Sequence, residues 1–137
     1  MAQKLILTAD DNAQIRMLVK AALRSLGHEL IEAVDGEQAL ELAIARQPDL
    51  VLLDVTMPKL DGWEVLRFMR QRPETTDVPV MMLTTAAQKM DLDHAASLGC
   101  NDYLTKPFSP GDLRQHVERM LSDDSPSPSD VEDQIVS

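Results

Sequence analysis

Asp54 is the residue of this sequence best placed to do chemistry, because it follows an apolar run that predicts a buried strand. The run, 50–53, holds four branched aliphatic residues and no polar one, as in strands covered on both faces. Pro58 and the Asp61-Gly62 pair then indicate a loop and a turn. A strand that delivers one carboxylate to a loop is typical of a site at the carboxyl edge of an open α/β sheet, although Asp54 alone could simply cap a helix.

Three other apolar runs also end in residues that are able to do chemistry. Asp10 and Asp11 follow the first run, Thr84 ends the fourth, and Lys106 ends the fifth. In a parallel sheet of strand order 2-1-3-4-5 these runs are neighbours of the Asp54 run, so their side chains would converge at one edge. Singly, the acidic pair could cap a helix, Thr84 could be a loop residue and Lys106 a surface lysine, but their convergence is the stronger signal.

Three carboxylates at close range repel one another, and one lysine does not balance them. A hard divalent cation would do so. Mg²⁺ fits because it uses one or two carboxylates, keeps several waters and completes its shell with phosphate oxygens. A phosphoryl group arriving at Asp54 would meet this cation, Lys106 and the Thr84 hydroxyl. The cluster therefore predicts phosphoryl transfer with Asp54 as the nucleophile.

Strands and helices must alternate along the chain to bring these residues together. Gly27 predicts the end of the first helix, and Ser109 with Pro110 predicts the start of the last. Such alternation favours a doubly wound parallel sheet, and five units in about 120 residues suit the flavodoxin-like (βα)5 fold of order 2-1-3-4-5. The expected strands are 5–7, 30–34, 50–53, 78–83 and 102–105, and the expected helices are 15–26, 39–44, 63–69, 87–98 and 109–121.

The composition restricts the class of protein. The 137 residues suffice for one domain, and the hydrophobic 44% includes only four aromatic residues, so the core must be aliphatic. A net charge of −10 leaves no basic face, which argues against direct binding of nucleic acid or anionic membranes. Cys100, the single cysteine, excludes an intramolecular disulfide and a cysteine-based zinc site. With no apolar run of membrane-spanning length, we expect a soluble cytoplasmic protein.

The last stretch of the chain, 122–137, differs from the rest. It has five acidic residues, five serines, two prolines and no lysine or arginine. A segment with so little apolar surface cannot order itself by burial. We expect residues 1–121 to form the domain and residues 122–137 to be a disordered acidic tail or a linker stub.

The chain resembles the receiver domain of response regulators in two-component signalling, from Lys4 to about Leu121. The resemblance implies a stand-alone phosphoacceptor module that takes a phosphoryl group from a histidine kinase or a histidine phosphotransfer protein. It implies no enzyme activity beyond self-catalysed phosphorylation and slow dephosphorylation. The family's order and spacing are matched by Asp10-Asp11, the run from Asp54 to Gly62, Thr84, Tyr103 and Lys106-Pro107-Phe108.

The same resemblance implies how the acidic residues divide the work. Asp54 matches the phosphorylated aspartate of the family. Asp10 and Asp11 match the pair that holds or orients Mg²⁺, together with Asp54 and a backbone carbonyl at the position of Thr56.

The resemblance also implies roles for the residues at the ends of the last two strands. Lys106 matches the lysine that pairs with the phosphoryl group and precedes a cis peptide at Pro107. Thr84 matches the threonine that moves toward the phosphoryl group. Tyr103 matches the tyrosine that turns inward when this threonine has moved. The switched surface would then be the fourth helix, the fifth strand and the fifth helix.

His116 departs from one branch of this family. It stands where regulators with winged-helix DNA-binding outputs usually have an arginine that forms a dimer salt bridge. We therefore expect a monomer or a weak phosphorylation-dependent dimer, whose switched face binds another protein.

Two other classes of protein share part of the pattern. A haloacid-dehalogenase-like Mg²⁺ phosphohydrolase also uses a strand-end aspartate, but it needs a second aspartate two residues later, where this chain has Thr56. A non-phosphorylated receiver-like scaffold would normally have lost Asp54, Lys106 or the acidic pair. Steady turnover of a phosphomonoester would indicate the hydrolase, and failure to label Asp54 would indicate the scaffold.

Overall fold

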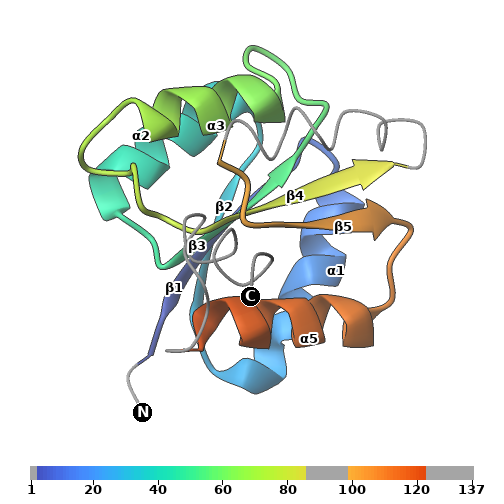
Figure 1. Cartoon of the computed structure of the whole chain (residues 1–137). Coiled ribbons are helices and arrows are strands. Elements are labelled where there is room, and N and C mark those ends of the chain that lie inside the picture. The colour runs from blue at the N-terminus through green and yellow to red at the C-terminus, as the bar shows by residue number, and fades with distance from the viewer. Residues whose placement is uncertain (1–2, 86–98, 123–137) are drawn as a thin grey trace, which may run out of the picture.

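Five parallel strands form one sheet in the order β2-β1-β3-β4-β5, which confirms the predicted topology (Figure 1). The computed structural model describes residues 3–85 and 99–122. The expected fourth helix, 87–98, and the expected tail beyond residue 122 lie outside these residues. The strands are β1 (Leu5–Ala9), β2 (Glu29–Ala33), β3 (Leu50–Asp54), β4 (Val80–Thr85) and β5 (Asp102–Lys106).

Helices cover both faces of this sheet, as in a doubly wound fold (Figure 1). On one face lie α2 (Gly36–Arg46) and α3 (Gly62–Arg70), and on the other lie α1 (Ala13–Leu23) and α5 (Pro110–Leu121). Successive strand residues point to opposite faces, so each face has its own core. Met81 belongs to the core beneath α1 and α5, and Met82 to the core beneath α2 and α3.

The central strand, β3, buries all five of its residues between β1 and β4. Its apolar run therefore has the environment that the sequence predicted. Because Asp54 is the last residue of this strand, the same packing buries its carboxylate, and only 9% of that side chain is exposed.

All five strands differ in extent from the prediction. β1 continues to Ala9 rather than ending at residue 7, and β3 and β5 each continue one residue further, to Asp54 and Lys106. β4 begins at Val80 rather than residue 78, because Pro79 has no N–H to add to the ladder and contributes only a carbonyl, which accepts from the Val51 N–H at 3.0 Å. β4 also continues to Thr85, so Thr84 lies inside the strand and pairs with Thr105 of β5. β2 spans 29–33 instead of 30–34.

The helix boundaries follow the capping residues. Asn12 caps α1, since its Oδ1 accepts from the Gln14 N–H at 2.8 Å, and Ser109 caps α5 in the same way through the Asp112 N–H at 3.0 Å. Gly27, at φ 74°, ends the short 3₁₀ turn that extends α1, as the sequence predicted.

Backbone hydrogen bonds hold the loop that follows β3 on both sides. The Val55 N–H donates to the Leu83 carbonyl at 3.1 Å, and the Gly62 N–H returns to the Val55 carbonyl at 2.8 Å. Gly36, the first residue of α2, donates its N–H to the Pro58 carbonyl at 3.2 Å. The loop is therefore held between the starting residues of α2 and α3.

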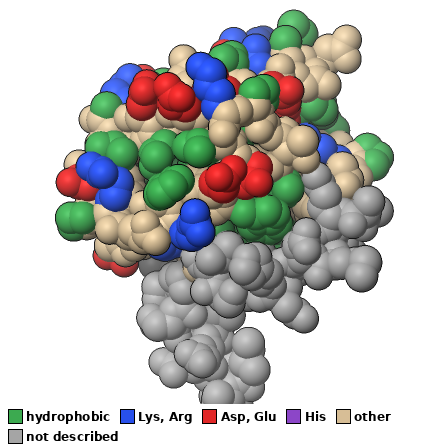
Figure 2. All heavy atoms as spheres, turned by 90° about the horizontal axis from the view of Figure 1, so that it is seen from above, with side chains coloured by type: hydrophobic (Ala, Val, Ile, Leu, Met, Phe, Trp, Pro, Cys, Tyr) green, Lys and Arg blue, Asp and Glu red, His purple; other side chains and the backbone are tan. Residues whose placement is uncertain are grey.

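The surface over α2 and α3 mixes acidic, basic and hydrophobic side chains (Figure 2). No broad field of one charge sign is visible among the described residues on this face. None of the described helices is long and apolar enough to cross a bilayer.

Candidate functional site

Asp10, Asp54 and Lys106 come from three strand ends and meet at the carboxyl edge of the sheet. Lys106 Nζ donates to Asp54 Oδ1 at 2.9 Å and to Asp10 Oδ2 at 3.0 Å. Only 1% of the Asp10 side chain and 19% of the Lys106 side chain are exposed. One cation is thus shared by two buried carboxylates.

Asp11 lies beside this pair and is exposed. One carboxylate oxygen from each of Asp10, Asp11 and Asp54 lies within 4.8 Å of the other two. We call these three residues the acidic cluster. Neither member of the Asp10-Asp11 pair caps α1, because Asn12 takes that role. The helix-capping interpretation of this pair is therefore wrong.

The acidic cluster carries more negative charge than its lysine balances. Burial raises the pKa of the Asp54 carboxyl above its ordinary value of 3.8, and the charge of Asp10 adds to this shift, while the hydrogen bond from Lys106 opposes it. Burial by itself would lower the pKa of Lys106, but the hydrogen bonds to Asp54 and Asp10 raise it instead. The lysine is therefore held charged, and the ionised form of Asp54 is less stabilised than that of an ordinary aspartate.

Two backbone features next to the cluster involve residues that the sequence singled out. The Thr56 N–H forms a hydrogen bond with the Asp54 carboxylate, and Thr56 is exposed in the loop after β3. The peptide between Lys106 and Pro107 is cis.

Thr84 and Tyr103 lie on neighbouring strands but in different surroundings. Thr84 is fully buried, and its Oγ1 donates to the Thr85 carbonyl at 3.1 Å. Tyr103 is 41% exposed. The tyrosine is therefore at the surface in this structure, rather than turned inward.

Sequence reasoning missed a second charged group, which joins β5 to α5. Asp102 Oδ2 lies 2.7 Å from Arg119 Nη2 and 2.8 Å from His116 Nδ1. We call these three residues the Asp102 group. His116 is half-buried, with 26% of its side chain exposed. The separation of three between residues 116 and 119 was the available signal, because it places both on one side of a helix.

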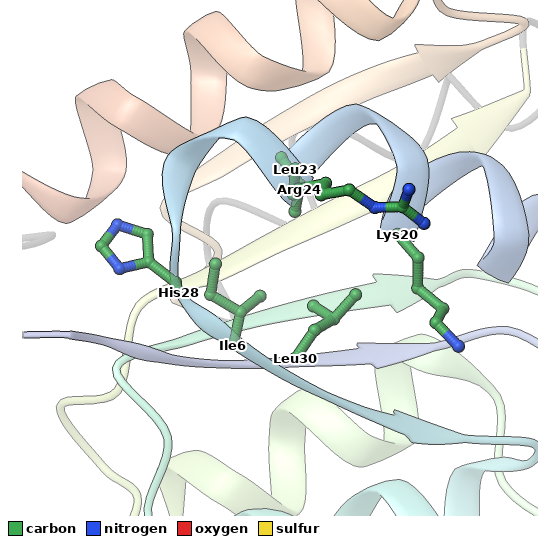
Figure 3. Close-up of a pocket in the computed structure, with 6 residues that line it drawn as sticks. All are labelled: Ile6, Lys20, Leu23, Arg24, His28 and Leu30. Atoms are coloured by element: carbon green, nitrogen blue, oxygen red, sulfur yellow. The ribbon is translucent and has the colours of Figure 1, made fainter.

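The pocket in Figure 3 lies at the other edge of the sheet. Ile6 and Leu30 line it near the starts of β1 and β2, whereas the acidic cluster lies at the strand ends. Its volume is about 190 Å³. This pocket is therefore separate from the acidic cluster.

The acidic cluster suits a divalent cation that prefers oxygen ligands. Three carboxylate oxygens within 4.8 Å of one another, two of them from buried side chains, are a donor set of the kind that Mg²⁺ takes. The negative charge left over after pairing with Lys106 is an independent reason to expect a cation there. The residues present therefore fit the predicted Mg²⁺.

Comparison with known proteins gives a family for this chain. The sequence profile of the response regulator receiver domain matches residues 6–118. The alkaline phosphatase synthesis transcriptional regulatory protein PhoP of Bacillus subtilis is 42% identical over 118 residues, which are 86% of this chain and 48% of that protein. The chain spans about half the length of the curated relatives it matches.

Solved structures agree with the sequence match. The chemotaxis response regulator CheY4 of Vibrio cholerae superposes with a TM-score of 0.82 at 31% identity, covering 88% of this chain and 100% of that one. The receiver domain of a sensor histidine kinase from Pseudomonas aeruginosa, solved with a magnesium ion coordinated in its active site cleft, gives 0.79 at 34% identity, with 88% and 98% covered. By sheet topology, family profile and solved relatives alike, the chain belongs to the response regulator receiver domain family of two-component systems.

Proposed function

We propose that Asp54 accepts a phosphoryl group, with Mg²⁺ bound, from a histidine kinase or a histidine phosphotransfer protein. The observation that carries this proposal is the meeting of the acidic cluster with Lys106 at one buried edge of the sheet. The receiver domain solved with magnesium in its cleft supports the choice of cation. The module catalyses only its own phosphorylation and slow dephosphorylation.

Each residue has a defined task in this reaction. A carboxylate oxygen of Asp54 forms a bond to phosphorus as the bond from phosphorus to the donor nitrogen breaks, and the electron pair of that bond stays with the donor histidine. Lys106, which is 2.9 Å from Asp54 Oδ1, then pairs with an oxygen of the transferred group. Mg²⁺, held by Asp10, Asp11, Asp54 and the Thr56 carbonyl, would supply positive charge to the phosphoryl oxygens.

The proposed output is a change of surface. The Thr84 hydroxyl, now bonded to the Thr85 carbonyl, would turn to the phosphoryl group, and Tyr103 would move inward from its exposed position. The affected surface is residues 87–98 with β5 and α5. A bias of a few kcal/mol between two pre-existing states is sufficient for such a switch.

The Asp102 group bears on the partner of this surface. Asp102 already contacts His116 and Arg119 of its own chain, which leaves it less able to pair with a second copy. We propose that the switched face binds a different protein or pairs weakly. Sedimentation with and without beryllofluoride, a phosphoryl mimic, should show a monomer or a weak dimer. A tight mimic-dependent dimer through this face, unaffected by substitution of His116, would contradict this.

We also propose that residues 1–121 are the functional domain, with 122–137 as a tail, and that the protein acts in the cytoplasm. The end of the family match at residue 118 supports this boundary.

Labelling with acetyl phosphate tests the nucleophile. With MgCl₂ present, the intact mass of the parent should rise by one phosphoryl group, and Asp54→Asn should abolish the rise. Asp49→Asn is the matched control, because Asp49 binds the Leu5 N–H at the opposite edge of the sheet. Equal labelling of Asp54→Asn would refute the assignment. Steady release of phosphate from a phosphomonoester would instead identify a hydrolase.

A further inference from the structure

The peptide that joins Asp10 to Asp11 is held by a side chain of α1. Arg16 Nη1 donates to the Asp10 carbonyl oxygen at 2.7 Å. The other polar atoms of Asp10 are also engaged: its N–H donates to the Ala33 carbonyl at 3.1 Å, and its Oδ1 accepts from the Asn12 N–H at 2.9 Å. The Asp10 carbonyl belongs to the peptide that joins Asp10 to Asp11. The hydrogen bond from Arg16 therefore fixes the orientation of this peptide plane and with it the direction in which the chain continues to Asp11.

Arg16 is itself held from β2. Its Nε donates to Glu32 Oε1 at 3.1 Å, and only 16% of its side chain is exposed. Lys20, one turn further along α1, pairs with the other oxygen of Glu32 at 3.1 Å. Arg16 and Lys20 thus share an acid and a helix, but among the described contacts only Arg16 reaches the backbone of the acidic cluster.

From these contacts we infer that Arg16 is a positioning residue for the Mg²⁺ site, an inference that rests on the proposed function. Its guanidinium keeps the Asp10 and Asp11 carboxylates in the arrangement in which their oxygens lie close to those of Asp54. Outer partners of this kind commonly change metal affinity by about 10–100-fold when they are removed.

Electrostatics alone predicts the opposite effect of removing Arg16, so the direction of the change in Mg²⁺ affinity tests the inference. Arg16 is a cation near a site for another cation, so removing its charge alone would tighten Mg²⁺ binding. If positioning dominates, removing Arg16 weakens binding. Lys20 serves as the matched control, because its removal takes away the same charge from the same helix and the same acid while the Asp10 carbonyl contact remains.

The experiment is calorimetric titration of the full chain with MgCl₂. Arg16→Gln should bind Mg²⁺ about tenfold more weakly than the parent. Lys20→Gln should bind within about twofold of the parent or slightly more tightly. Arg16→Lys, which keeps the charge but not the planar fork, should recover part of the affinity. Labelling of Arg16→Gln with acetyl phosphate should need a higher MgCl₂ concentration than labelling of the parent, because the weakened site fills only when more Mg²⁺ is present.

Melting temperatures in EDTA separate a folding defect from a change in the site, and Arg16→Lys carries the test if Arg16→Gln does not fold. Unchanged or tighter Mg²⁺ binding by Arg16→Gln, or equal weakening by Lys20→Gln, would overturn the inference while leaving the proposed function intact. A parent protein that does not bind Mg²⁺ would overturn the proposed metal site, and this inference with it.

Discussion

The acidic cluster, with its partner Lys106, and the Asp102 group both join carboxylates to basic side chains, but they differ in their balance of charge. In the acidic cluster three carboxylates have one lysine among them. In the Asp102 group a single carboxylate contacts both a histidine and an arginine. The cluster therefore retains negative charge after its internal pairing, whereas the Asp102 group does not.

The two groups also differ in burial, which determines how strongly their charges interact. The Asp10 side chain is 1% exposed, whereas the Asp102 side chain is 13% exposed and its partner Arg119 is 62% exposed. Charges interact strongly where water is excluded, and exposed ion pairs contribute about 0–1 kcal/mol. The acidic cluster thus keeps excess negative charge at a buried strand edge, whereas the Asp102 group pairs its charge through a partner at the surface.

Lys106→Met should have the largest effect, because it removes the one cation that two buried carboxylates share. Without Mg²⁺ at pH 7, the free energy of unfolding should fall by about 3 kcal/mol. Arg119→Met, the matched loss of a cation from the Asp102 group, should cost less than about 1 kcal/mol. Urea unfolding in EDTA measures both. Similar losses in the two variants would remove the distinction between the two groups.

The two carboxylates should respond with opposite signs to the same neutral replacement. Asp54→Asn removes a buried charge that repels its neighbours, so without Mg²⁺ it should stabilise the fold by about 1 kcal/mol. Asp102→Asn breaks satisfied contacts and should destabilise it by about 0.5 kcal/mol. Urea unfolding in EDTA decides this, and a destabilised Asp54→Asn would show that Lys106 fully compensates the acidic cluster.

The Asp54 effect should depend on pH. The raised pKa of folded Asp54 means that, between its ordinary value of 3.8 and the raised value, the folded protein binds more protons than the unfolded chain. Stability from protonated Asp54 is present below 3.8 and is lost as the pH rises through the folded pKa. The advantage of Asp54→Asn over the parent should therefore be full at pH 7 and should shrink as the pH is lowered toward 4. A constant difference across this range would contradict the assigned cause.

The smallest effect should come from the tail, although it contains five acidic residues. Removing residues 123–137 should leave the melting temperature, the Mg²⁺ affinity and the labelling rate nearly unchanged. A charge affects the site only if it lies close to it, because electrostatic interactions are screened over about 8 Å in physiological salt. Asp11→Asn removes a single charge yet should weaken Mg²⁺ binding. If the truncation matches or exceeds that change, the tail contacts the domain.

The sequence was informative about the order of the strands and about which polar residues lie at their carboxyl ends. The strand order and the meeting of Asp54 with Lys106 both follow from apolar runs that end in polar residues. These features need only periodicity and the parallel geometry of the sheet.

The sequence was less informative about contacts between a helix and a strand. Arg16 reaches the Asp10 carbonyl, and Asp102 reaches α5, only because of how the helices pack on the sheet. No short-range pattern encodes such distances. The cap of α1 is Asn12 and not the acidic pair, and its neighbour Asp11 is of a residue type that suits an N-cap equally well.

The hydrogen bonds that hold the loop after β3 in place restrict which positions near this loop can be substituted. A Cβ on Gly36 would collide with the Leu60 carbonyl, and a Cβ on Gly62 would collide with the Asp54 carbonyl. Since the obstacles are backbone atoms, neither glycine tolerates replacement without moving the loop. Thr56, Pro58 and Lys59 are exposed in the same loop. Substitution of these outward side chains can therefore change the surroundings of the Asp54 carboxylate, while the path of the chain past that carboxylate stays the same.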